Sequence, residues 1–558
     1  MSGSKRALFR NVATLLANMQ LKRNSPGRVI EVFRTMESRA DTSFNDLEIY
    51  SFPQGMASWA VLVSLVLATE RAREEPGYKN YDVKLINLSI RGALALRWIQ
   101  ERGKDAKSEA QTFKWTPSLA RAVDQALAIA AKYLVFSDCF SMWHQDREFA
   151  ELLSESVARF TAPGGMSARR VSAFQKGFRP VSSPAQDEGL VLSPAQAQDR
   201  DAAFSPCFYA GHLAMAYPEP IEFYNSLFPS YFGRLDAMFR RADSLDLGPY
   251  TMGELKRAYA AFTTVLSAHE DFCYRFGVRH QYPVNSCVMM QTSDQWAKLL
   301  ARIARLEEPK CSAIVEDLTL RDRYWDLHVE PFITVGDNVL AVAPQFPLHS
   351  RADENILRVC NHRRDSYFAK AAQMKEQEML DDLLPRCPKN VSASVRISLP
   401  NRLGDIDLLL VDEEAKAVIV AELKWFRKPS SQWKERIHRE EDFGKGSQKL
   451  SEIRTFLLEN PSFLSARGKL KRPLNEYQRV AFVLVARDFF LWLDSHDLIL
   501  ADYEVFKEAV VKTADLAGLI DKLRAYEWLP VEGKDFRVAF EPVGLNGVTI
   551  ESEKFYRI

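Results

Sequence analysis

Two apolar runs that carry acidic residues constrain the fold of this chain more than any other feature of its sequence. They are GDIDLLLVDEE, which starts at Gly404, and AVIVAELKW, which starts at Ala417. Both are rich in Val, Ile and Leu, and the acidic turn from Asp412 to Glu414 separates them, as in consecutive strands. A third strand-like run, SASVRISL, comes just before them. The pattern predicts three sequential β-strands.

Alternation along these strands brings charged residues together. Asp405, Asp407 and Leu409 share one face of the second strand, and Glu422 and Lys424 share one face of the third. In an antiparallel hairpin the start of one strand lies beside the end of the other, so we expect Asp407 and Glu422 to converge, with Lys424 on the same side. Asp405 is expected to be an exposed or supporting residue rather than a ligand.

Two converging carboxylates are typical ligands of a hard divalent ion such as Mg²⁺, for which Mn²⁺ can substitute. The predicted metal ligands are therefore Asp407 and Glu422. Phosphodiester hydrolysis suits such a site, because a metal-bound water attacks phosphorus and the metal offsets charge on the phosphate oxygens. Lys424 would orient or deprotonate that water, or stabilise the phosphorane. The alternative is a structural ion pair between Lys424 and either carboxylate.

One helix is expected before the three strands in the sequence, and another is expected after them. The segment YFAKAAQMKEQEMLDDLLPR has helical apolar spacing, places Glu376 on its apolar face and stops at Pro385. After the strands, GKGSQKLSEIRTFL is expected to be a helix, and RVAFVLVAR from Arg479 is expected to be a fourth strand.

The order of these elements and residues resembles the PD-(D/E)XK nuclease superfamily, which has the restriction-endonuclease-like fold. The resemblance covers residues 366–510 and implies a mixed sheet flanked by helices. It implies that Asp407 is the aspartate of the second core strand and that Glu422 and Lys424 are the (D/E)-x-K pair. Glu376 matches the acidic residue of the first helix, with Glu378 as the alternative, and Gln448 matches a glutamine of the next helix. No proline precedes Asp407, although one is common in the superfamily.

Basic residues cluster in the segments after the third strand. They are predicted to contact the phosphate backbone of a nucleic acid, and neighbouring aromatics such as Trp425 and Trp433 could stack on bases or pack in the core. The alternative is a solvated surface. The candidate binding residues are Arg427, Lys428, Lys434, Lys445, Lys469, Lys471 and Arg472.

Changes in periodicity divide the rest of the chain. HVEPFITVGDNVLAVAP reads as a β-hairpin that could act as a joint, and the Pro-, Gly- and Ser-rich stretch before residue 206 reads as a linker. The expected organisation is a helical domain at 1–160, a flexible linker or long loop at 161–205, a helical domain at 206–323, a hairpin connector at 324–365, the nuclease-like domain at 366–510, and a helix and strand extension at 511–558.

Composition limits the classes of function. The 558 residues carry a net charge of +1, so any nucleic-acid binding must come from local patches. The seven cysteines form no C-x-x-C pair, which is typical of reduced thiols and argues against structural zinc. The longest apolar run, Met56 to Thr69, is shorter than the roughly 20 residues of a membrane span. No signal peptide, P-loop or G-x-S-x-G motif occurs, so we expect a cytoplasmic protein without a membrane partner.

The sequence thus predicts an α/β restriction-endonuclease-like C-terminal domain appended to a large, mainly α-helical N-terminal region. The expected activity is Mg²⁺-dependent DNA endonuclease, and by analogy with stand-alone bacterial proteins of this build it would serve in anti-phage defence. The alternatives are a nuclease acting on RNA or single strands, and a non-catalytic nucleic-acid-binding or scaffold protein. We expect the helical region to gate the site and aid self-association as a homo-oligomer, and a fragment of residues 320–558 to fold alone.

Overall fold

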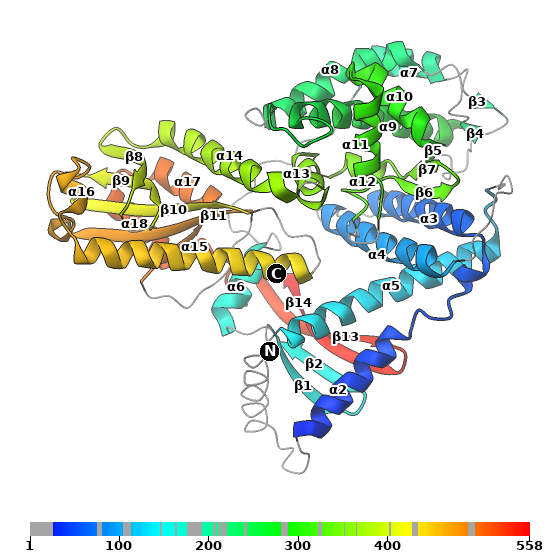
Figure 1. Ribbon diagram of the computed structural model, residues 1–558. Helices are drawn as coiled ribbons and strands as arrows, with labels where there is room; N and C mark the ends of the chain where they lie inside the picture. The colour runs from blue at the N-terminus through cyan, green and yellow to red at the C-terminus, as the bar shows by residue number, and fades with distance from the viewer. Residues whose placement is uncertain are drawn as a thin grey trace.

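The computed structural model has helices predominating in its N-terminal part and mixed sheets in its C-terminal part (Figure 1). This agrees with the predicted α/β class at that coarse level. The structure describes residues 26–74, 81–103, 113–145, 148–161, 165–175, 192–204, 208–209, 212–213, 220–238, 243–280, 288–321, 326–350, 352–363, 365–400, 403–426, 433–488 and 497–558.

A five-stranded sheet organises the C-terminal part, with strand order β12-β11-β10-β9-β8. β8, β9 and β10 are antiparallel neighbours, whereas β10, β11 and β12 run parallel. The elements are α14 (Asp365–Leu383), β8 (Val391–Ser398), β9 (Asp405–Asp412), β10 (Ala417–Trp425), α15 (Trp433–Glu459), α16 (Phe463–Ala466), β11 (Arg479–Arg487), β12 (Ile499–Asp502), α17 (Tyr503–Lys512) and α18 (Leu516–Ala525). The predicted helix, three strands, following helix and fourth strand are confirmed as secondary structure.

Each face of this sheet packs against helices, which explains why its central strands are almost wholly apolar. On one face, Leu409, Val418 and Val420 form a core with Phe443 and Leu450 of α15. The opposite face packs against α14, α17 and α18. Figure 1 shows α14 and α15 on opposite sides of the sheet. The predicted alternation therefore holds, and Glu422 and Lys424 continue the row that faces α15.

Helices near the N-terminus form a separate core. Residues Met56 to Thr69 lie in α3, and most of that segment is buried, as predicted. α5 is long and apolar enough by composition to cross a membrane, but its buried side chains pack against those of α3 and α4. The bounds are α2 (Pro26–Asp41), α3 (Gln54–Glu74), α4 (Tyr81–Arg102) and α5 (Pro117–His144).

A four-stranded sheet joins the segment after α5 to the last two strands of the chain and corrects two expectations. Its order is β1 (Phe149–Ser154), β2 (Val157–Thr161), β14 (Val548–Arg557) and β13 (Phe536–Leu545), with β14 parallel to β2. The helical reading of residues 1–160 is therefore wrong at β1 and the start of β2. The expectation that a fragment of residues 320–558 contains the partners of all its strands is also wrong. In that fragment β14 would lose its partner β2.

The expected linker at 161–205 is also wrong where the structure describes it. α6 (Gly165–Gln175) and α7 (Pro194–Phe204) are helices. Arg170 of α6 donates hydrogen bonds to the carbonyl oxygens of Tyr526, Leu529 and Pro530, which anchors the segment to the chain that follows α18. α7 is capped by Ser193, whose hydroxyl accepts from the Gln196 backbone while the Gln196 amide accepts from the Ser193 backbone.

The middle of the chain is helical around a small sheet. The predicted hairpin is confirmed as β6 and β7, with Asn338 at a φ of 58° in its turn. It is not an isolated joint, because β7 also pairs with β5, and Ile333 and Val335 are buried in the core that contains α3. The bounds are β3 (Phe208–Tyr209), β4 (His212–Leu213), α8 (Ile221–Met238), α9 (Met252–His280), β5 (Met289–Thr292), α10 (Ser293–Ala304), α11 (Glu308–Asp317), β6 (Ile333–Gly336), β7 (Val339–Val342), α12 (Gln345–Leu348) and α13 (Ala352–Arg363).

Candidate active site

The two carboxylates singled out in the sequence meet at one end of the β9–β10 hairpin. The backbone N–H of Leu423 donates a hydrogen bond of 2.8 Å to Oδ2 of Asp407. This fixes Asp407 beside the residues on either side of Leu423, which are Glu422 and Lys424. The antiparallel register, in which Ala421 lies opposite Leu408, is the reason for the convergence.

Glu422 is completely buried and is held by two ammonium groups. Nζ of Lys424 lies 2.7 Å from Oε1 of Glu422. Nζ of Lys449, from α15, lies 2.8 Å from Oε1 and 2.7 Å from Oε2. A buried carboxylate without partners is costly, and the two ammonium groups supply those partners.

Lys449 joins the site, although the sequence marks it only as one of many basic residues after the third strand, whereas Gln448 does not join the site. The exposed Gln448 side chain donates to Glu452 one turn further along α15. Gly404 has a φ of 76°, and a Cβ built there would lie 3.4 Å from Cε of Lys449. The glycine is explained by this positive φ, which L side chains rarely adopt, whereas the space beside Lys449 would admit a Cβ at ordinary contact distance.

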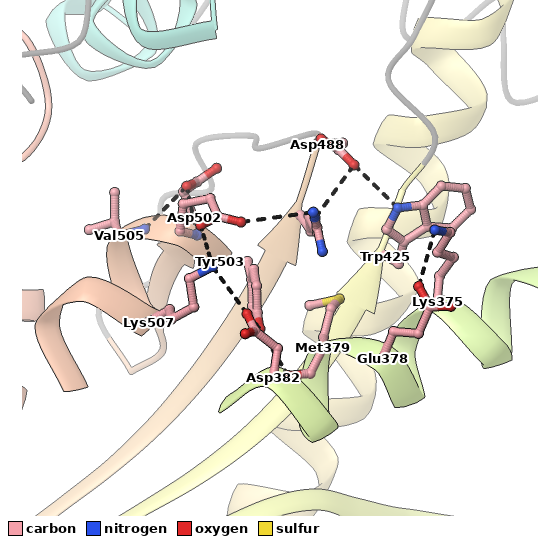
Figure 2. A network of polar contacts seen from close by, with 12 residues as sticks. Lys375, Glu378, Met379, Asp382, Trp425, Asp488, Asp502, Tyr503, Val505 and Lys507 are labelled. Atoms are coloured by element: carbon pink, nitrogen blue, oxygen red, sulfur yellow. Dashed lines mark hydrogen bonds and ion pairs between the residues drawn. The ribbon is translucent and has the colours of Figure 1, made fainter. Parts of the chain in front are cut away.

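Glu376 reaches the same end of β10 from α14. Its Oε1 lies 4.0 Å from Nζ of Lys424 and accepts a long hydrogen bond of 3.4 Å from the backbone N–H of Trp425. The alternative acidic residue, Glu378, instead forms an ion pair of 3.1 Å with Lys375 on the same helix (Figure 2). Between the two candidates, the structure brings Glu376 to the site.

Electrostatics set the protonation of this cluster. Burial raises the pKa of Asp407 to about 7, and the Glu422 carboxylate adds to the rise, while Lys449 and Lys424 oppose it. Burial likewise raises the pKa of Glu376. Burial disfavours the charged form of Lys424, but the carboxylates of Glu422 and Glu376 outweigh it, so the pKa of Lys424 is raised. Lys424 is therefore a cation at neutral pH and not a free base.

The donor chemistry fits a divalent ion. Asp407 and Glu422 repel each other strongly enough to contribute to the raised pKa of Asp407, and a cation between them would remove that repulsion. Within the described ranges, no group of three or more His, Cys, Asp or Glu side chains could hold a metal. Mg²⁺ commonly uses only one or two protein carboxylates and takes its other ligands from water and substrate.

A cavity of about 360 Å³ opens beside the lysines, between the end of β10 and α15. Its walls are basic and aromatic on the whole. They are made by Ala372, Lys424, Trp425, Phe426, Arg439, Asp442, Lys445, Gly446 and Lys449.

The predicted basic residues divide into three sets. Lys445 lines the cavity beside the site. Arg427, Lys428 and the side chain of Lys434 lie outside the described residues. The third set, Lys469, Lys471 and Arg472, belongs to the loop before β11.

The expectation that this third set lies beside the site is wrong for Lys471 and Arg472. The backbone N–H of Lys471 donates to Glu413, and Arg472 lies 3.7 Å from the same carboxylate. Glu413 stands in the β9–β10 turn, at the opposite end of the hairpin from Asp407. The separation along the strand is about 20 Å at a rise of ~3.3 Å per residue.

Comparison with known proteins adds no assignment. No family model matches the chain, and no curated protein or solved structure matches it significantly.

Proposed function

We propose that this protein is a metal-dependent nuclease whose site is built by Asp407, Glu422 and Lys424. One observation carries the proposal: a wholly buried glutamate, a second carboxylate with a pKa near 7 and two lysines meet at one end of a hairpin beside a basic cavity. Titratable groups with perturbed pKa values that gather beside a cavity are candidates for a functional site.

The order of elements supports the finer fold assignment. α14, β8, β9, β10, α15 and β11 follow in the order that the resemblance to the PD-(D/E)XK nucleases implies, and the three antiparallel strands are joined by a parallel fourth. Asp407, Glu422, Lys424 and Glu376 stand on the elements that carry the corresponding residues in that superfamily. We therefore propose a restriction-endonuclease-like domain.

The chain's own residues have separable roles. Asp407 and Glu422 would hold the divalent ion, which supplies Lewis-acid activation of water and offsets phosphate charge when bound. Lys424, protonated because its pKa is raised, stabilises negative charge on the phosphorane and does not deprotonate water. Glu376 lies 4.0 Å from the Lys424 ammonium group and adds a second carboxylate beside it.

Lys449 balances charge in the site. Its ammonium group contacts both oxygens of Glu422 and supplies a positive charge beside that buried carboxylate. A metal ion would share Glu422 with this lysine. Lys449 then remains close enough to attract a phosphate, which assigns it to substrate binding as well as to charge compensation.

We propose DNA as the substrate, with RNA and single strands as alternatives that the assay separates. Purified full-length protein is incubated with plasmid, linear duplex DNA, single-stranded DNA and RNA, in Mg²⁺ and in chelator. Wild-type protein is expected to cut at least one substrate in Mg²⁺. Glu422→Gln keeps the shape of the side chain and is expected to lower the rate by a factor of about 10² or more.

Lys471→Gln is the matched control, because Lys471 is exposed and lies at the far end of the hairpin. It should cut at the wild-type rate. If none of the substrates is cut in Mg²⁺ or Mn²⁺, or if Glu422→Gln cuts as fast as the control, the carboxylates and lysines are a structural ion network and the nuclease proposal fails.

A further inference from the structure

The last two strands of the chain form a long hairpin whose outer strand is a sheet edge (Figure 1, red). β13 pairs with β14 along the full length of both strands. Among the described residues, no strand pairs with the other side of β13, and only an isolated bridge from Glu532 to Phe536 touches its start. An edge strand presents backbone N–H and C=O groups to which another strand can add.

The turn of the hairpin determines which backbone groups point outward. Asn546 and Gly547 form a two-residue loop with φ values of 46° and 74°, as in a type I′ turn. The residues that flank such a loop, Leu545 and Val548, form a hydrogen-bonded pair, and the direction of the backbone groups alternates from there along the strand. The N–H and C=O groups of odd-numbered residues in β13 thus point to β14, and those of even-numbered residues point outward.

Two local features agree with this alternation. Pro542, which has no N–H, stands at an outward position, where an edge strand tolerates proline. The C=O of Phe536 accepts a hydrogen bond of 2.8 Å from the backbone N–H of Gly533, which precedes the strand. The remaining outward N–H groups of β13 belong to Val538, Phe540 and Gly544.

The outer side of β13 is accessible to a second strand. Val538 and Phe540 are partly exposed, and the Arg537 guanidinium lies 5.3 Å from the ring centre of Tyr556 on β14. The exposed residues of the strand are Arg537, Ala539, Glu541, Pro542 and Gly544.

The other edge strands of the two larger sheets carry features that hinder pairing. β1 has a register shift between Leu152 and Ser154. β8 contains Arg396 at a left-handed φ of 51°, and β12 has only 4 residues. Bulges, irregular backbone and short length all protect an edge. β13 has no such interruption in its register, so it is the edge best suited to pairing.

Charge selects a second copy of β13 as the partner. If two copies pair antiparallel about a two-fold axis through Ala539, Val538 lies opposite Phe540 of the second copy. In the same register Arg537 lies opposite Glu541 of the second copy, and each pair occurs twice because of the symmetry. Apolar and opposite-charge pairs directly across two strands are both favourable. A shift of the register in either direction separates Arg537 from Glu541.

We propose that β13 is a self-association edge, through which two copies of the chain join their four-stranded sheets into one continuous sheet. The outward groups of Val538 and Phe540 supply the backbone hydrogen bonds, and Arg537 with Glu541 fixes the register. This places self-association on the C-terminal hairpin and not on the helical region. It does not depend on the proposed nuclease function, because no residue of that site lies in β13.

Sedimentation of the full-length protein tests the proposal through charge reversal. One strand edge buries less than a standard interface of about 1,600 Å², so we expect a reversible dimer with a dissociation constant of about 1–100 μM. Glu541→Arg and Arg537→Glu should each weaken the dimer about tenfold or more, because two like-charge pairs replace two opposite-charge pairs. The double variant Arg537→Glu/Glu541→Arg should recover the dimer to within a few-fold of wild type. Such a recovery cannot come from misfolding.

A matched control separates the two edges of the sheet. Glu151 is an exposed residue of β1, at the opposite edge, and Glu151→Arg makes the same change of charge as Glu541→Arg. It should leave the dissociation constant unchanged.

Disulfide trapping tests the register itself. The axis through Ala539 makes this residue and its copy a pair without mutual hydrogen bonds, with Cα atoms about 4.5 Å apart. A disulfide spans Cα separations of about 4.4–6.8 Å, so Ala539→Cys should form a covalent dimer with oxidised glutathione. Gly544→Cys lies far from its own copy in this register and should not. Wild type, treated identically, controls for the native thiols.

The results that would overturn the proposal are specific. They are a wild-type mass of one chain up to about 100 μM, a dimer that both single charge reversals leave unchanged, and a double variant that associates no better than the single variants. Weakening by Glu151→Arg but not by Glu541→Arg would move the interface to β1. A covalent dimer of Gly544→Cys without one of Ala539→Cys would exclude the proposed register.

Discussion

Replacing Asp407 with Asn should stabilise the sheet at alkaline pH, although it removes a site residue. Burial and the Glu422 carboxylate raise the pKa of Asp407 from 3.8 to about 7, so the folded state holds this proton more tightly than the unfolded state does. Ionisation of the folded protein then costs stability, and the cost appears above pH 3.8 and is complete above about pH 7. It is about 2 kcal/mol near pH 5.5 and at most about 4 kcal/mol at pH 8.

The expected result is a pH-dependent difference between variant and wild type. Hydrogen exchange, followed by mass spectrometry on peptides covering residues 405–425 in EDTA, measures the local opening free energy of β9 and β10. Asp407→Asn should raise it at pH 8 by about 2 kcal/mol more than at pH 5.5. Asp405→Asn, on the same strand, is the matched control and should show no such difference. An equal effect of Asp407→Asn at the two pH values would refute the electrostatic account of this site.

Other expectations follow from the same contacts. The Lys449→Met variant should bind Mn²⁺ several-fold more tightly than wild type in calorimetry, because one cation no longer competes for Glu422. The control variant, Lys445→Met, should bind Mn²⁺ as wild type does. Weaker metal binding by Lys449→Met would contradict the charge-balancing role of Lys449. The triple change of Lys469, Lys471 and Arg472 to Ala should leave the salt dependence of DNA binding unchanged, because Lys471 and Arg472 contact Glu413 far from the site. If the slope of log affinity against log salt concentration fell by two or three units, these residues would belong to the DNA-binding surface after all. A fragment of residues 320–558 should lose exchange protection in residues 549–552, which pair with β2 in the full chain; protection equal to the full chain would show that β14 folds without that partner.

The sequence pattern could predict those strands whose pairing partners are close in sequence. β9 and β10 follow from two apolar runs separated by an acidic turn, and their antiparallel register brings Asp407 to Glu422. The pairing of β14 with β2 joins residues that are 392 apart in sequence, such as Arg159 and Glu551, and nothing local marks it. α7 was missed although Ser193 and Gln196 form a capping box, because the Pro- and Gln-rich composition outweighed that short signal.

The candidate site divides in the same way. The strand residues were identified because each sits at the end of an apolar run, where a charge is conspicuous. On α15, lysine and glutamine are adjacent in a polar stretch, so the sequence does not tell which of them faces the sheet. Phe443 and Leu450 pack on the sheet, which fixes the rotation of α15 about its axis. Lys449 is thereby turned toward Glu422, while Gln448 faces solvent.

The most direct test of the central claim is a cleavage reaction run in ¹⁸O-labelled water with the best substrate. With Mg²⁺, wild-type protein should release products that carry one labelled oxygen on the new terminal phosphate, and chelator or Glu422→Gln should suppress that product by a factor of about 10² or more. Labelled product formed at the same rate in chelator, or no labelled product from any nucleic acid with Mg²⁺ or Mn²⁺, would contradict the account.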